Sequence, residues 1–204
     1  MTKTLTLLVI GLALVQTANA GPTPIDAPDA LNLMAHSNFY IWKVELGNTA
    51  ALTNLEIVFE DLYNWDSRDN SLYVQVLGAD DLAPFTFDNQ GMYVGVDQPS
   101  YGNYFNTVGG VEIGRYTDLD GPASMEDVRF VFTDQAMQLV RDSLSGDTYT
   151  FGLGIDADCL YNATGGTSLQ LAPAPPPVPA PGAVVLGALG VGLIGVLRRR
   201  RSLS

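Results

Sequence analysis

Short runs in which apolar and polar residues alternate constrain the fold of this chain most. In segment 128–132 and in segment 149–155, apolar side chains recur at every second position. A period of two places those side chains on one face of a β-strand, and puts the glycines and threonine of the second segment on the other face. The expected strands are 39–46, 55–59, 72–77, 92–96, 111–116, 128–132, 149–155 and 169–171.

Turn-forming residues separate these runs, for example at 88–91, at Gly109-Gly110 and at Gly165-Gly166. About eight short strands joined by turns favour an antiparallel β-sandwich. One stretch breaks the pattern: Thr133 can cap a helix over 134–144, with Gly146 just past its end. The sequence therefore predicts an all-β sandwich over residues 36–172 with one short helix.

The N-terminal residues 1–20 have the order of a secretory signal peptide. Lys3 precedes an apolar run over 5–15, and the small residues Ala18 and Ala20 follow at the spacing that signal peptidase accepts. We expect cleavage before Gly21, which leaves residues 21–35 as an N-terminal lead.

The C-terminal end has three parts: a Pro/Ala linker over 173–181, an apolar stretch over 182–197, and an arginine-rich tail over 198–204. As a helix, the apolar stretch reaches about 24 Å, and flanking arginines can close the gap to a ~30 Å hydrocarbon core. Arginines resist transfer across a membrane, so the tail is expected to stay cytoplasmic while the body is exported. The residues that stop transfer are Arg198, Arg199, Arg200 and Arg201. A plain single-pass anchor is the alternative to a processed tail.

The three-part tail resembles the PEP-CTERM sorting signals that exosortases process. The motif residues are Val178, Pro179, Ala180 and Pro181, with Ala180 where the family has glutamate. The resemblance, over about the last thirty residues, implies that an exosortase-type protease cuts near the motif and that the protein passes to the cell envelope or extracellular matrix. The order of a strand, a short helix and the turn 144–147 before an alternating strand resembles the last third of jelly-roll domains in such exported proteins, which implies a jelly-roll-like sandwich. Within it, segment 154–162 is similar to a stretch of those proteins, with Ala157 for proline and Leu160 for histidine.

The exported part is strongly acidic. Between residues 21 and 172, five basic residues stand against all 22 acidic ones, a net charge of −17. Such a surface repels phosphates and anionic lipid, which excludes nucleic acid as a partner. Two interpretations remain: solubility in a salty medium, and binding of a divalent cation such as calcium, the one cofactor that the composition suggests.

Two Asp-x-Asp pairs are the candidate metal ligands. Asp156 and Asp158 can point to one side of a strand end, with Asn162 as a third oxygen donor. Asp118 and Asp120 repeat the spacing, although the surrounding loop is not an EF-hand. The alternative is that these carboxylates cap turns through backbone N–H groups.

Aromatic residues in polar loops are the candidate carbohydrate ligands. Tyr63 and Trp65 lie in one such loop, and Tyr101 lies in a second with Tyr104 and Phe105. Aromatic faces beside carboxylate acceptors can bind sugars. The alternative is that they cover the hydrophobic core.

Catalysis finds little support. Cys159 is the single cysteine, so no internal disulfide can form. His36 is the single histidine, and because no motif joins it to a nucleophile, no catalytic residue is assigned. The sequence predicts a non-catalytic exported surface or matrix protein that binds calcium or polysaccharide. A carbohydrate-binding module and a secreted glycoside hydrolase, which needs two carboxylates, are the alternatives.

Overall fold

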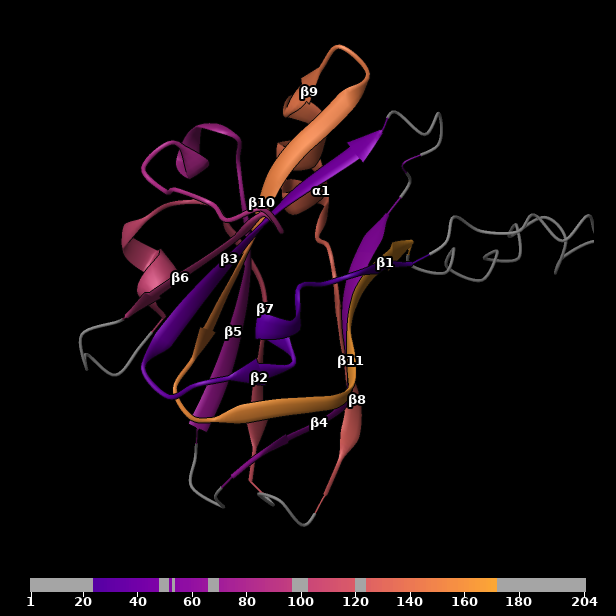
Figure 1. The fold of residues 1–204 in the computed structure, drawn as a ribbon. Coiled ribbons are helices and arrows are strands. Elements are labelled where there is room, and N and C mark those ends of the chain that lie inside the picture. The colour runs from indigo at the N-terminus through magenta and orange to yellow at the C-terminus, as the bar shows by residue number, and fades with distance from the viewer. Residues whose placement is uncertain are drawn as a thin grey trace, which may run out of the picture. The chain divides into compact units, whose positions relative to one another are not determined.

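Two antiparallel sheets face one another in the computed structural model, which describes residues 24–47, 52, 54–65, 70–96, 103–119 and 124–171 (Figure 1). We name them sheet A and sheet B. Sheet A has the order β1-β11-β4-β8, with β2 also pairing with β11. Its strands are β1 (Ile25–Asp26), β2 (Leu33–Met34), β4 (Leu55–Asn64), β8 (Glu126–Val131) and β11 (Tyr161–Leu171).

Sheet B has the order β6-β3-β10-β5-β7, and β9 pairs with the start of β10. Its strands are β3 (Asn38–Gly47), β5 (Asn70–Leu77), β6 (Met92–Val96), β7 (Val111–Asp118), β9 (Leu144–Ser145) and β10 (Thr148–Ala157). The prediction of an all-β, antiparallel sandwich with one short helix is confirmed.

The main core lies between the two sheets. Phe151, Leu153 and Ile155 of β10 enter it from sheet B, as the alternation predicts, and each is fully buried. Phe59 and Phe130 enter from sheet A, with their rings edge to face at 6.1 Å. The period-two pattern thus supplies one apolar face to each sheet.

A second, smaller core covers the outer face of sheet B. The 3-10 helices Asp80–Leu82 and Tyr104–Thr107 lie over this face, where Phe39 stacks on Tyr104 with ring centroids 3.7 Å apart. A Cβ at Gly154 would lie 2.8 Å from the ring of Phe105, closer than carbon atoms pack. A Cβ at Gly152 would likewise meet Leu82 at 2.6 Å, so the glycines of β10 face packed side chains of the second core, not solvent.

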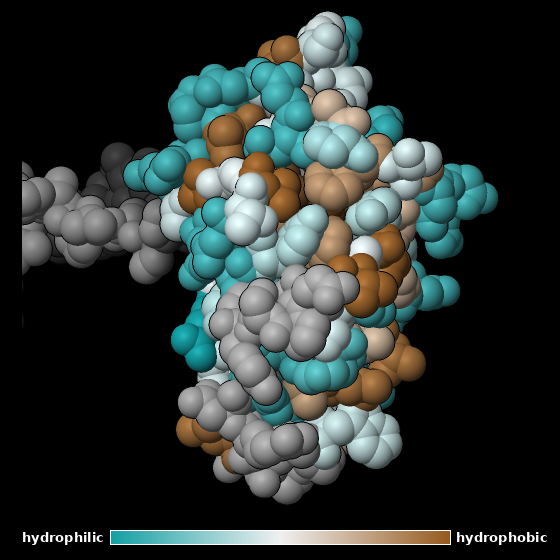
Figure 2. All heavy atoms as spheres, turned by 90° about the vertical axis from the view of Figure 1, so that its left-hand side faces the viewer, coloured by the Kyte–Doolittle hydropathy of each residue, from teal (hydrophilic) through white to brown (hydrophobic). Residues whose placement is uncertain are grey.

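Seen from the side of β6, the described surface carries hydrophobic residues in small separate groups among hydrophilic ones (Figure 2). The second core therefore exposes no broad apolar surface in this view.

Helix α1 (Asp134–Asp142) lies beside β10 (Figure 1). The Thr133 hydroxyl accepts a hydrogen bond from the Ala136 backbone N–H at 3.2 Å, which confirms the expected N-cap. The helix ends two residues earlier than expected, because Leu144 already belongs to β9. Gly146, with φ +61°, serves the turn between β9 and β10.

The N-terminal lead is a correction to the expected domain boundary. β1 and β2 lie within residues 21–35, and both pair with β11, so the described part of the lead belongs to the sandwich. Such two-residue strands are too short to show alternation, which is why the sequence pattern missed them.

The pair Gly165-Gly166 is a second correction. It was expected to be a turn, but it lies inside the eleven-residue β11 as a bulge, where the register shifts between Ala163 and Gly166. Gly166 has φ +107°, a conformation that glycine adopts without strain. The last strand therefore begins eight residues before the expected 169–171.

Residues 1–23 and 172–204 lie outside the described residues, so the signal peptide, linker, apolar stretch and arginine tail remain predictions. In the described ranges, no helix is both long and apolar enough to cross a membrane.

Candidate functional site

One end of the outer face of sheet A carries a row of side chains from three strands. A bulge at Asp61, whose φ is +52°, shifts the register of β4, so that Leu62 is buried and Tyr63 takes an outward position. Tyr63 pairs with Asn162 of β11, and Asn162 pairs in turn with Leu33 of β2. The Asn162 side-chain amide donates a hydrogen bond to the Tyr63 hydroxyl at 3.0 Å.

Trp65 extends this row past the end of β4. Its ring is 59% exposed, although its backbone N–H donates to the Leu160 carbonyl at 3.2 Å. The intervening Asn64 points the other way, because its side chain donates to the Asp118 carbonyl of sheet B at 3.0 Å. Trp65 and Tyr63 therefore share a side, since strand residues alternate. We call Leu33, Asn162, Tyr63 and Trp65 the aromatic row.

A groove of about 450 Å³ lies farther along the same face. The N-terminal lead forms one wall, and residues of β4 and β11 line the rest. Three carboxylates line it, and none of the described lining residues is Lys, Arg or His. The lining residues that matter below are Asp26, Asp29, Asn32 and Glu60. We call this the acidic groove.

Asn32 carries an unpaired acceptor in the groove wall. Its side-chain oxygen Oδ1 is buried and has no hydrogen-bond partner among the residues that the structure describes. A buried acceptor without a donor costs free energy.

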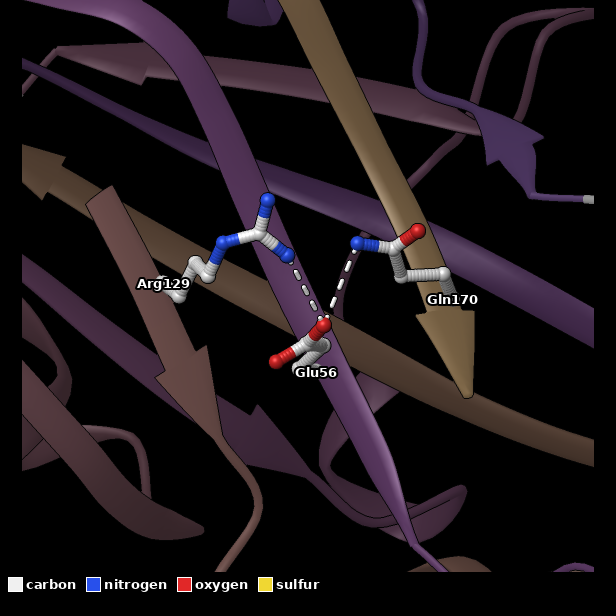
Figure 3. A network of polar contacts seen from close by, with 3 residues as sticks. All are labelled: Glu56, Arg129 and Gln170. Atoms are coloured by element: carbon white, nitrogen blue, oxygen red, sulfur yellow. Dashed lines mark hydrogen bonds and ion pairs between the residues drawn. The ribbon is translucent and has the colours of Figure 1, made fainter. Parts of the chain in front are cut away.

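A polar network lies at the end of the outer face of sheet A that is opposite to the aromatic row (Figure 3). Arg129 Nη1 and Gln170 Nε2 both donate to Glu56 Oε1 at 3.1 Å, which links β8, β4 and β11. The Glu56 side chain is only 4% exposed, so the guanidinium neutralises a carboxylate that would otherwise be buried as an unpaired charge. The Arg129 guanidinium is therefore paired with the Glu56 carboxylate.

The expected metal pair Asp156 and Asp158 have different surroundings. Asp156, at 2% exposure, lies on the outer face of sheet B, and its Oδ2 accepts the Tyr104 backbone N–H at 2.7 Å. Asp158 lies beyond the end of β10, where its own N–H donates to the Ser71 carbonyl at 2.9 Å. The Asp156 carboxylate thus anchors the second core to sheet B.

Asp118 and Asp158 both act electrostatically on Tyr161. Burial, with the two carboxylates among the further causes, raises the pKa of the Tyr161 phenol above its usual range. Asp118 Oδ2 also accepts the Asn64 backbone N–H at 3.0 Å. Among the residues that the structure describes, no three His, Cys, Asp or Glu side chains gather closely enough to hold a metal ion.

The remaining candidates divide into two groups. Tyr104 and Phe105 pack in the second core, as expected if these aromatic residues cover a hydrophobic core. That core lies over the outer face of sheet B and not between the two sheets. The others lie outside the described residues: Asp120, Tyr101, Ala18, Ala20, Gly21, Val178, Pro179, Ala180, Pro181 and the four arginines.

No motif or periodicity in the sequence indicated the acidic groove. Asp26, Asp29 and Asn32 come from a proline-containing lead without periodicity, and Glu60 precedes an unforeseen bulge. The available sequence hint of an acidic surface was that Asp26 and Asp29 lie close together in the N-terminal lead.

Fold and geometry together define a two-sheet β-sandwich that carries an aromatic row and an acidic groove on one face. No protein-family model, curated protein or solved structure matches this chain.

Proposed function

We propose that this chain is a non-catalytic, exported surface or extracellular-matrix protein whose β-sandwich binds a polysaccharide on the outer face of sheet A. The observation that carries the proposal is Trp65, which is 59% exposed beside Tyr63. Exposing an indole to water is unfavourable, so an exposed tryptophan next to polar groups is typical of a binding surface.

The chemistry of the aromatic row suits a sugar chain. An indole ring is a flat, rigid surface against which the C–H face of a sugar ring can stack, with little loss of side-chain entropy. Tyr63 and Asn162 supply a hydroxyl and an amide that can hydrogen-bond to sugar hydroxyls. The row continues into a polar groove, which a linear polymer can follow.

The export half of the proposal rests on the two ends of the sequence. In this proposal, the signal peptide directs export of the acidic domain. Because the tail resembles a PEP-CTERM sorting signal, an exosortase-type protease is the proposed processing partner. The jelly-roll resemblance and the membrane segment 182–197 belong to the same proposal. A plain anchor, a secreted glycoside hydrolase and calcium binding remain alternatives for experiment.

Binding to a panel of extracellular polysaccharides tests the proposal. Purified residues 21–171 should bind at least one polymer saturably, and Trp65→Ala should abolish that binding. Val96→Ala is the matched control, because Val96 is 72% exposed on β6 of the other sheet. Flat binding curves across the panel, or equal losses in both variants, contradict the proposed function.

Mass spectrometry of the mature C-terminus tests the sorting step. In cells with an exosortase, we expect a terminus near Pro181, and in cells without one, the intact arginine tail. An intact tail in both strains would leave the plain anchor as the correct interpretation.

A further inference from the structure

Strand β6 ends sheet B and pairs on one side with β3 (Figure 1). The Lys43 N–H donates to the Gly91 carbonyl at 2.7 Å, and such hydrogen-bonded pairs recur at every second residue of an antiparallel ladder. The residues between them, Met92, Val94 and Val96, therefore direct their backbone groups away from β3. These groups point to the edge of the sheet.

Met92 has partners at this edge. Its N–H donates to the Asp88 carboxylate at 2.8 Å, and its carbonyl accepts the Asp88 N–H at 3.0 Å. Within the described residues, the outward backbone groups of Val94 and Val96 bond to no part of the chain. The two valines are also 46% and 72% exposed. A strand edge with unpaired backbone groups and exposed apolar side chains is a template for pairing with another strand.

The three other strands that end a sheet are protected from such pairing. Charged side chains and irregular pairing keep a sheet edge from joining another chain. The charged residues are Asp26 in β1, Glu112, Arg115 and Asp118 in β7, and Glu126, Asp127 and Arg129 in β8. The register of β7 also shifts against β5. β6, with the sequence Met-Tyr-Val-Gly-Val, has neither a charge nor a register shift.

A second copy of β6 fits this edge. With a twofold axis at Gly95, antiparallel pairing sets Val94 opposite Val96 of the second copy, and the reverse. The outward backbone groups of these residues can then bond to one another, and each valine gains an apolar neighbour across the two strands. The Phe39 ring already fills the space beside Gly95, so no side chain hinders the approach at the axis.

The charge of the chain favours this occupant over a basic one. Residues 21–172 carry a net charge of −17, which attracts basic partners to most of the surface. β6 offers such a partner no carboxylate to pair with. Two copies of β6 set no like charges opposite each other, so the strand suits an identical strand.

We infer that two copies of this protein associate through β6, which joins sheet B of each copy into one continuous antiparallel sheet. The inference goes beyond the proposed function and does not depend on it. A strand of five residues forms a small interface, so the dimer is expected to be weak. Chains that are held close together at a surface or in a matrix raise the effective concentration at which such a pair forms.

Sedimentation velocity at rising protein concentration tests the inference. Purified residues 21–171 contain both hydrophobic cores and are suited to the measurement. We expect a monomer–dimer equilibrium that shifts toward the dimer as salt is added, because salt screens the repulsion between two acidic copies.

Val94→Lys should raise the dissociation constant roughly tenfold or more, because it sets a charge against the apolar edge. Val131→Lys is the matched control, since Val131 is also 46% exposed and lies on β8 at the edge of sheet A. Both variants change the net charge equally, and thermal melting shows whether each is folded.

Cysteine cross-linking tests the register of the pair. In a Cys159→Ala background, a mixture of Val94→Cys and Val96→Cys proteins should form disulfide-linked dimers more readily than either protein alone. The reason is that the pairing sets these two positions opposite each other, within the reach of a disulfide. Equal cross-linking in the mixture and in the separate proteins contradicts this register.

Three results overturn the inference: a monomer at every concentration and salt, a dimer that Val94→Lys and Val131→Lys weaken equally, or a dimer that salt dissociates. Trp65→Ala should dimerise normally, so loss of the dimer and loss of polysaccharide binding are separate results. Because a dimer carries two aromatic rows, the polysaccharide affinities of Trp65→Ala and Val96→Ala are compared where both are monomeric.

Discussion

Replacing Gly154 with alanine should destabilise the sandwich, because the new methyl group would enter the second core. The added Cβ would lie 2.8 Å from Cε1 and Cζ of Phe105, whereas non-bonded carbon atoms prefer about 3.5 to 4.0 Å. The ring or the strand must therefore move by roughly 0.7 to 1 Å. Phe105 is fully buried and meets Phe39 and Tyr104 edge to face at 5.8 and 5.5 Å, so it has little room to retreat.

The expected magnitude follows from two opposing effects. Forcing a methyl group into a packed core costs about 1 to 3 kcal/mol. The loss of backbone freedom in the unfolded chain offsets about 0.4 to 1 kcal/mol of that. We expect a net loss of about 1 to 2 kcal/mol in the free energy of unfolding.

Gly47→Ala is the matched control, since no atom lies within 4 Å of the position of its Cβ at the end of β3. In urea denaturation of residues 21–171, Gly154→Ala should lower the midpoint by roughly 0.5 to 1 M for a slope near 2 kcal/mol/M. Gly47→Ala should leave the midpoint unchanged or raise it slightly.

Equal midpoints for the two variants would refute the reasoning, because the steric difference between the sites would then have no energetic effect. The pairing with the ring is checked by adding Phe105→Leu to Gly154→Ala. The combined loss should be smaller than the sum of the two single losses, since both changes act at one contact.

Three further predictions concern the stability of the fold and are checked by denaturation, by thermal melting and by its dependence on pH. Arg129→Met should cost about 1 to 2 kcal/mol, because it leaves the buried Glu56 carboxylate without its cation, whereas Lys43→Met, at an exposed ion pair, should change stability by under about 0.5 kcal/mol. Asp156→Asn should lower the melting temperature equally with calcium and with chelator, and a loss that is larger with calcium than with chelator would identify a metal ligand instead. The raised pKa of Tyr161 means that the folded state holds the phenol proton more tightly, so stability is intact below the unfolded pKa of about 10 and falls as pH rises above it. Tyr161→Phe should show a shallower fall, and identical pH profiles would contradict this assignment.

The strands that alternate strictly were predictable from sequence. Residues 149–155 of β10 lie in the expected position, because one apolar face is enough to orient this strand against the core. Residues 92–96 form β6 as expected, although Val94 and Val96 of its alternating set are exposed. The Thr133 cap was also visible, since capping depends on neighbouring residues alone.

What depends on distant contacts was not predictable. Gly154 is explained by Phe105 and Gly152 by Leu82, both of which lie far away in sequence. Sequence spacing suggested that Asp156 and Asp158 act together, whereas in the structure the Asp156 carboxylate accepts the Tyr104 N–H and Asp158 lies beyond the end of β10 beside Ser71. The acidic groove was missed for the same reason, because it forms only when the lead pairs with β11.

The direction of β11 places Trp65 far from Leu171, where the described part of the sandwich ends. The strand starts beside Trp65, where Tyr161 pairs with Asn64, and ends at Leu171, from which the polypeptide continues toward the arginine tail. Ten steps along a strand amount to roughly 33 Å. Trp65 and the end of β11 therefore lie at opposite ends of one paired strand, and a change in the length of the linker leaves the distance between them unchanged.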